Sequence, residues 1–194
     1  MKICGLNYFM ELMNRCSWVL DDELYVKYHD EEWGVPVHDD KVLFEFLILE
    51  GAQAGLSWIT ILRKREAYGK AFCDWDYEAV AGFGDEDFGR LMGDAGIVRN
   101  RLKIKSAIRN AKAFIEVVNE FGSFDSYIWG FVDGKVVINN FKSVAELPAS
   151  TELSEEISKD LKRRGFNFVG PVIVYAFMQA IGIVDDHEIG CFKK

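Results

Sequence analysis

Residues 49–60 read Leu-Glu-Gly-Ala-Gln-Ala-Gly-Leu-Ser-Trp-Ile-Thr. We expect the helix that ends in this stretch to be central, with the other helices of the chain packed around it. In residues 42–49 every residue except Glu45 is apolar, so a helix there is hydrophobic around most of its circumference and is predicted to be buried. Glu50 breaks this pattern, because it lies on the same helical face as Leu43 and Leu47. A carboxylate on a buried face must be paired, hydrogen-bonded or neutral.

Two explanations of Glu50 remain open from these residues alone. The carboxylate either caps a backbone or pairs with a buried arginine, or it faces a ligand. Space beside Glu50 is left by small residues, namely Gly51, Ala52, Ala54 and Gly55. Trp58 follows eight positions after Glu50. Open space, a flat aromatic face and an anion together suit a planar ligand that is cationic or rich in hydrogen-bond donors.

Length and composition limit the class of protein. The chain has 194 residues, 49% of them hydrophobic, which suffices for one substantial domain. Its net charge of -8 means that any DNA-binding face must be a local basic patch. No uncharged apolar run is long enough to span a membrane, and four scattered cysteines favour a reducing cytoplasm over secretion. Residues 1–13 lack the pattern of a secretory signal and are expected to be an N-terminal extension.

Helical periodicity covers most of the remaining chain and predicts an all-α fold. Helices are expected at residues 61–72, 77–81, 85–92, 102–118, 123–129, 154–163 and 172–181. Residues 134–138 form the only strand-like run, and one short strand cannot build a sheet-based fold.

Two features suggest contacts with phosphate. Basic residues recur along one face of the helix predicted at 102–118, namely Arg101, Lys105, Arg109 and Lys112. Such a row is either a solvated face or a phosphate-binding surface, and the acidity of the chain favours the second. The second feature is a hairpin between the last two helices, where Gly165 and Gly170 would let backbone amides approach a phosphate and Arg164 adds charge. An ordinary turn between two helices is the alternative.

Aromatic and metal-ligating side chains are concentrated near the two ends of the chain. Trp18, Tyr25, Tyr28 and Trp33 form a dense aromatic set, which is typical of a core or an interface as well as of a ligand pocket. His187 and Cys191 are four residues apart, and Cys16 with His29 could complete a tetrahedral site of two cysteines and two histidines. Spacing alone is a weak signal for that site, because no Cys-x2-Cys pair anchors it.

The segment 49–60, the hairpin and the flanking motifs from Cys16 to Cys191 closely resemble the DNA-3-methyladenine glycosylase I family of the helix-hairpin-helix DNA glycosylase superfamily. The hairpin departs from the superfamily's generic Gly-x-Gly but is similar to this family's own version. The resemblance implies a single helical domain over residues 14–194, with two lobes around a base pocket, that acts as a cytoplasmic monomer. It implies hydrolysis of the N-glycosidic bond of 3-methyladenine in alkylated double-stranded DNA, with release of the free base and repair of the lesion.

The same resemblance implies roles for individual residues. Glu50 would recognise and position the flipped base. The other pocket residues would be Tyr28 as a hydrogen-bonding partner, Trp58 and Tyr25 as stacking partners, and Trp18 as part of the wall. Contacts with DNA would come from Arg164, Gly165, Gly170 and an apolar wedge, Leu56. A structural Zn2+ would be held by Cys16, His29, His187 and Cys191, with Asp185 and Asp186 orienting His187.

Two further expectations concern the reaction. Val172, Ile173 and Val174 occupy the region where lyase-active relatives carry a lysine, so no lyase activity is expected. Two alternative functions stay open at this point: a zinc-stabilised, noncatalytic DNA-binding module, and an enzyme that acts on a free cationic purine nucleoside. The DNA-binding module would not need a buried Glu50 beside Trp58, so it leaves the pocket unexplained. The nucleoside enzyme would not need the hairpin, so it leaves the hairpin unexplained.

Overall fold

The structure is a computed structural model that describes residues 14–19 and 21–194, so the extension expected at residues 1–13 lies outside the described residues. Its helices are α2 (Glu23–Glu31), α3 (Asp40–Gln53), α4 (Trp58–Leu62), α5 (Arg65–Ala71), η1 (Cys73–Trp75), α6 (Tyr77–Ala81), α7 (Asp85–Gly93), α8 (Arg101–Phe121), α9 (Phe124–Gly130), η2 (Val144–Glu146), α10 (Glu152–Arg163) and α11 (Pro171–Ala180). The predicted all-α class is confirmed. No helix in the described part of the chain is both long and apolar enough to cross a membrane.

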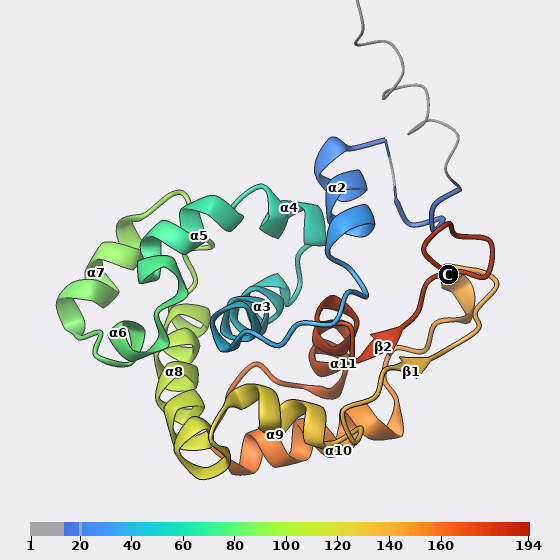
Figure 1. Ribbon diagram of the computed structural model, residues 1–194. Helices are drawn as coiled ribbons and strands as arrows, with labels where there is room; N and C mark the ends of the chain where they lie inside the picture. Colours follow the sequence, from blue (N-terminus) through green and yellow to red (C-terminus); the bar gives the residue numbers. More distant parts are fainter. Residues whose placement is uncertain (1–13, 20) are drawn as a thin grey trace, which may run out of the picture.

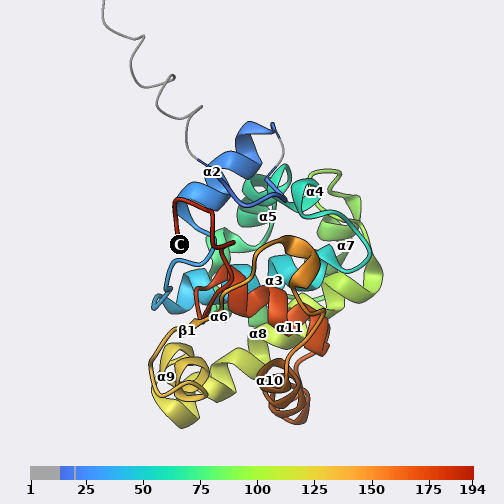
Figure 2. The ribbon, with the colours of Figure 1, turned by 90° about the vertical axis from the view of Figure 1, so that its right-hand side faces the viewer.

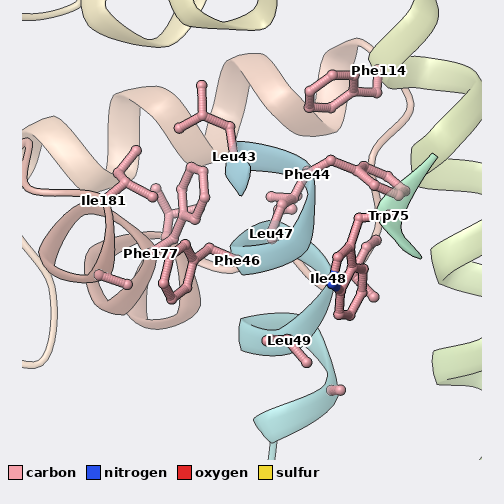
Figure 3. Close-up of a cluster of buried hydrophobic side chains, with 14 of the residues drawn as sticks. Leu43, Phe44, Phe46, Leu47, Ile48, Leu49, Trp75, Phe114, Phe177 and Ile181 are labelled. Carbon is pink, nitrogen blue, oxygen red and sulfur yellow. The ribbon is translucent and has the colours of Figure 1, made fainter. Parts of the chain in front are cut away.

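Helix α3 is the centre of the molecule, with α8 and α11 packed on it and the other helices arranged around them (Figure 1). Its first turn is capped by Asp39, whose side chain accepts hydrogen bonds from the backbone amides of Lys41 and Val42. The predicted burial of this helix is confirmed along its length, including Glu50. Figure 3 shows its apolar side chains meeting Phe177 of α11 and Phe114 of α8.

The helix predicted at residues 61–72 is interrupted, and its residues belong to two helices, α4 and α5. The break lies at Arg63 and Lys64. Four side-chain contacts hold Lys64 and Arg65 in place: the Lys64 ammonium donates to the carbonyls of Ala95 and Gly96, and Arg65 pairs with Glu32, the C-cap residue of α2, and with Glu45 of α3. Local periodicity could not reveal the break, because these partners are distant in sequence.

The strand expected within residues 134–138 is β1 (Val137–Ile138), and it pairs in parallel with an unpredicted strand, β2 (Val184–Asp185). This pairing brings the C-terminal segment beside residues 139–150, which connect β1 to α10 and which we call the strap. Figure 2 shows the strap crossing in front of α3 on its way to α10. The backbone amide of Ile189 donates to the carbonyl of Phe141 at 2.9 Å, which adds a further bond between the two segments.

Candidate functional site

An aromatic pocket of about 220 Å³ lies between α2, α3, α4, α11 and the strap. Its lining contains all five side chains that the sequence assigned to substrate recognition: Glu50, Tyr28, Trp58, Tyr25 and Trp18. The volume is below the ~300–1,000 Å³ of sites for drug-sized ligands, so the pocket suits one small ring system. Its residues come from segments as far apart in the sequence as Trp18 and Gln179, and α3 supplies the carboxylate.

Two polar atoms of this pocket are buried without a hydrogen-bond partner: Oε2 of Glu50 and Nε1 of Trp58. Each such atom costs about 1–3 kcal/mol relative to a satisfied one. Burial also raises the pKa of Glu50 to about 8, and a cationic ligand beside it would favour the carboxylate. An acceptor and a donor left unsatisfied in one pocket fit a ligand that presents a donor edge to Glu50 and an acceptor or a π face to Trp58.

The aromatic rings form the walls around Glu50. The rings of Tyr28 and Trp58 have centroids 5.3 Å apart and are tilted by 52°, and Trp18 meets Tyr25 edge-on at 5.7 Å. Burial and the nearby Glu50 carboxylate raise the pKa of Tyr28 well above its usual value, so Tyr28 stays a neutral hydroxyl. The hydroxyl of Tyr25 accepts from the backbone amide of Ile59 at 3.3 Å, which fixes this ring against α4. The walls therefore consist of electron-rich faces that favour a cationic ring.

Other residues of the pocket were not assigned to it from the sequence. They are Trp33, Gln53, Val144, Leu147, Ala176 and Gln179. Gln53 had a local signal, since it lies three positions after Glu50 on the same helical face, and Gln179 was the lone strongly polar residue of its apolar helix. Val144 and Leu147 had none, because they belong to a connector whose position depends on contacts with the C-terminal segment.

A second site lies at the junction of the N- and C-terminal segments. The ligand atoms of Cys16, His29 and Cys191 are all buried and lie within 4.8 Å of one another. The Sγ atom of Cys16 accepts from the amide of Glu188 at 3.3 Å, and the Sγ atom of Cys191 accepts from the amide of Lys193 at 3.5 Å. Burial raises the pKa of the Cys16 thiol to about 12 without a cation, whereas a bound metal would favour the thiolate.

His187 borders this cluster but does not belong to its closest group. Its ring lies 5.2 Å from that of His29, measured between centroids, and its buried Nε2 has no hydrogen-bond partner. A side chain at Gly34, where φ is +75°, would come within 2.6 Å of the His187 ring, so only glycine fits there. Two cysteines, His29 and an unsatisfied His187 are a donor set that fits Zn2+.

Of three carboxylates near the two histidines, two bind a ring nitrogen and the third does not. Asp185 binds Nδ1 of His187 at 2.8 Å, as expected, and Asp30 binds Nδ1 of His29 at the same distance. These contacts leave Nε2 of each histidine available for a metal. The expectation that Asp186 orients His187 is wrong, because its carboxylate accepts from side chains of Asn139, Tyr175 and Gln179 instead.

Side chains of α8 hold the hairpin between α10 and α11 in place. The side chain of Asn110 donates to the carbonyl of Asn167 at 2.9 Å and accepts from its amide at 2.8 Å. Arg109 donates to the carbonyl of Gly165 at 2.7 Å, and Gly165 has a φ of +96°, which favours glycine. Gly170 is the N-cap residue of α11, followed by Pro171 in the first helical turn.

The remaining residues assigned to DNA contact lie in contrasting environments. Leu56 is exposed at the turn after α3, between the pocket residues Gln53 and Trp58, so its side chain is accessible for the predicted role as a wedge. Arg164 is held in an ion-pair network with Asp160 at 2.6 Å and Glu120 at 2.7 Å, and its guanidinium stacks on Phe121. This geometry favours a structural role for Arg164. The four basic residues of the row predicted on α8, namely Arg101, Lys105, Arg109 and Lys112, are exposed, and Arg109 lies directly beside the hairpin.

Comparison with known proteins shows which family the chain belongs to. The sequence profile of the methyladenine glycosylase family matches residues 18–194. DNA-3-methyladenine glycosylase 1 of Escherichia coli (strain K12) is 49% identical over 92% of this chain and 96% of its own, and DNA-3-methyladenine glycosylase of Haemophilus influenzae is 43% identical over 93% and 97%. The structure of 3-methyladenine DNA glycosylase I from Staphylococcus aureus, solved to explain 3-methyladenine recognition, superimposes with a TM-score of 0.90 at 39% identity over 94% and 97% of the chains. The chain therefore belongs to the methyladenine glycosylase family.

Proposed function

We propose that this protein hydrolyses the N-glycosidic bond of 3-methyladenine in alkylated double-stranded DNA, releases the free base and leaves the strand uncut. One observation carries the proposal: the unpartnered Glu50 and Trp58 side chains face one small aromatic pocket. The lesion is a cationic purine that stacks and pairs less favourably than adenine, so extruding it from the duplex costs less. The relatives named above carry the same activity in their names.

The pocket recognises the base through charge and shape. Glu50 accepts hydrogen bonds from the donor edge of the base, while Tyr28 and Trp58 contact it and Tyr25 and Trp18 complete the walls. A cation between aromatic faces and beside a carboxylate is held more tightly than neutral adenine. A cationic base is already a good leaving group, so the protein needs to position it and to stabilise positive character on the sugar. Glu50 acts by recognition and positioning in this scheme.

Val172, Ile173 and Val174 after the hairpin support hydrolysis without lyase activity. These side chains cannot form a Schiff base with the sugar, which strand cleavage by a lyase requires. The product is then an intact strand with an abasic site. The free base leaves separately.

A structural Zn2+ is held by Cys16, His29, His187 and Cys191. The clustered donor atoms, the amide donors to both thiols and the unsatisfied Nε2 of His187 support this assignment. Four protein ligands would fill a tetrahedral site, so the ion joins chain segments and supplies no open coordination position for water.

DNA is bound at the hairpin and the adjacent end of α8. Backbone amides near Gly165 and Gly170 approach a phosphate, Arg109 adds charge beside them, and Leu56 fills the gap that the flipped nucleotide leaves. Arg164 supports the hairpin from its ion-pair network. Residues 14–194 act as one domain, and we expect a monomer in the cytoplasm, where free thiols such as those of Cys16 and Cys191 persist.

The test measures base release and strand cleavage on methylated duplex DNA. We compare the wild type with Glu50→Gln, and with Glu66→Gln as a control for the loss of one charge, since Glu66 is exposed and binds only Lys70. Folding is checked by circular dichroism and zinc content by atomic absorption. We expect the wild type and Glu66→Gln to release 3-methyladenine from uncut strands and Glu50→Gln to be impaired. A folded, zinc-loaded wild type that binds DNA without releasing base would refute the proposed reaction.

A further inference from the structure

Glu188 lies between the metal-ligating residues of the C-terminal segment, and its carboxylate binds two other parts of the chain. Its oxygens accept from the amide of Ser17 at 3.0 Å, from the hydroxyl of Ser17 at 2.5 Å and from the amide of Val144 at 2.9 Å. The side chain is buried, with 9% of the residue exposed. A buried carboxylate with three donors is an ordered junction, because each charge-assisted bond holds its partner strongly.

The main chain of Glu188 holds the metal cluster at the same time. Its amide donates to the Sγ atom of Cys16 at 3.3 Å, and its carbonyl accepts from the amide of Cys191 at 2.8 Å. Glu188 therefore contacts the cluster through its backbone and the strap through its side chain. No other residue in the described part of the chain has hydrogen bonds to both the cluster thiols and the strap in this way.

One partner of the Glu188 carboxylate lines the aromatic pocket, and the other precedes a residue that does. Ser17 directly precedes Trp18, and Val144 begins η2, which also leads to Leu147 in the pocket lining. The N-cap residue of η2, Ser143, makes no side-chain cap, so the Glu188 carboxylate satisfies the first amide of this helix from across the fold. The bonds of Glu188 thus hold Trp18, Val144 and Leu147 in place.

We propose that Glu188 is a positioning residue of the base pocket, which fixes the strap and the Trp18 wall relative to the metal cluster. This inference rests on the proposed function for the identity of the ligand, but the link between Glu188 and the strap is independent of it. Loss of the carboxylate frees the strap while the ligand atoms of the cluster stay in place. Loss of the metal, conversely, loosens the pocket through Glu188.

The test uses Glu188→Gln in the full chain, loaded with zinc, with Glu66→Gln as the matched control for charge. A glutamine side chain keeps the size of glutamate but places an NH2 group against an amide or hydroxyl donor. Hydrogen exchange of peptides covering residues 141–149 is measured without ligand, and the dissociation constant of free 3-methyladenine by calorimetry. We expect exchange in the strap to accelerate and base binding to weaken, each by about tenfold, with zinc content unchanged. Glu66→Gln should match the wild type in both.

A second variant, Val144→Pro, removes the same bond from the other side and leaves Glu188 intact. Proline fits the first position of η2, and Ser143 before it is already extended, with φ -157° and ψ 160°. If Glu188→Gln fails to bind zinc, Val144→Pro tests in its place whether the bond between Glu188 and Val144 holds the strap. Wild-type exchange in the strap of either zinc-loaded variant would overturn the inference. A wild type that binds no 3-methyladenine would instead overturn the proposed function, and the exchange measurement would still decide the role of Glu188.

Discussion

Replacing Glu50 by glutamine is expected to stabilise the protein at alkaline pH while it removes base recognition. Burial raises the pKa of Glu50 from 4.5 to about 8 in the folded protein. A carboxyl group with a raised folded-state pKa contributes stability that is fully present below its unfolded pKa and is lost as the pH rises through the folded value. Because a change of one in pKa corresponds to about 1.4 kcal/mol, ionisation of Glu50 lowers the free energy of unfolding by on the order of 5 kcal/mol between pH 4.5 and about 8.

The glutamine side chain has nearly the same shape and does not ionise, so the difference between the two proteins isolates Glu50 from other titrating groups. We expect wild type and Glu50→Gln to have similar free energies of unfolding near pH 5, and the variant to be more stable by roughly 5 kcal/mol near pH 9. Urea denaturation of the zinc-loaded proteins, followed by circular dichroism across this range, measures both values. A difference that does not change with pH would refute the reasoning, since it would mean that the Glu50 carboxylate is solvated or paired. Glu66→Gln, at an exposed position, should show no such dependence.

Four other substitutions test the remaining assignments. Cys191→Ser should lower zinc content and melting temperature, measured by atomic absorption and circular dichroism, and a full equivalent of tightly bound zinc would exclude Cys191 as a ligand. Asn110→Ala leaves the buried backbone of the hairpin without its partners and should weaken binding of methylated duplex about tenfold, with free 3-methyladenine bound as before. Unchanged DNA affinity would show that the hydrogen bonds of Asn110 do not matter for DNA binding. Arg164→Gln should lower the free energy of unfolding by about 1–2 kcal/mol but leave the salt dependence of DNA binding intact, and a slope reduced by about one would instead assign Arg164 to a phosphate. Leu56→Ala should slow base release from duplex DNA without changing the affinity for free base. Equal rates of base release by the wild type and the variant would exclude Leu56 as the wedge.

Elements that carry their own pattern could be predicted from the sequence. Helix α3 was expected because its apolar run, residues 42–49, and Glu50 follow one another directly in the sequence. Helix α8 and the hairpin were likewise expected from local periodicity and glycine placement. The resemblance to a glycosylase family was confirmed by the comparisons, whereas the roles of individual site residues remain predictions.

Features that depend on contacts between distant segments could not be predicted. The break between α4 and α5 is fixed by partners of Lys64 and Arg65 more than 19 residues away in sequence. Strand β2 exists only because β1 lies beside it, and the strap reaches the pocket only because Glu188 binds Val144 across 44 residues. Asp186 was assigned to His187 on proximity in the sequence, but its side chain faces α11. Pairing of this kind has no local periodicity to detect.

The arrangement of the two sites suggests how the proposed structural metal would contribute to the proposed reaction without taking part in its chemistry. In the described part of the chain, the buried side-chain nitrogen and oxygen atoms without a hydrogen-bond partner lie only at the pocket and beside the metal cluster, which are the two places where ligands are proposed. Neighbouring residues serve both sites, in the pairs Cys16 with Trp18, Tyr28 with His29, and His187 with Glu188. A metal bound by Cys16, His29 and His187 would therefore limit the movement of Trp18, Tyr28 and Glu188. By this argument, removing zinc should weaken base binding even though the ion never touches the base.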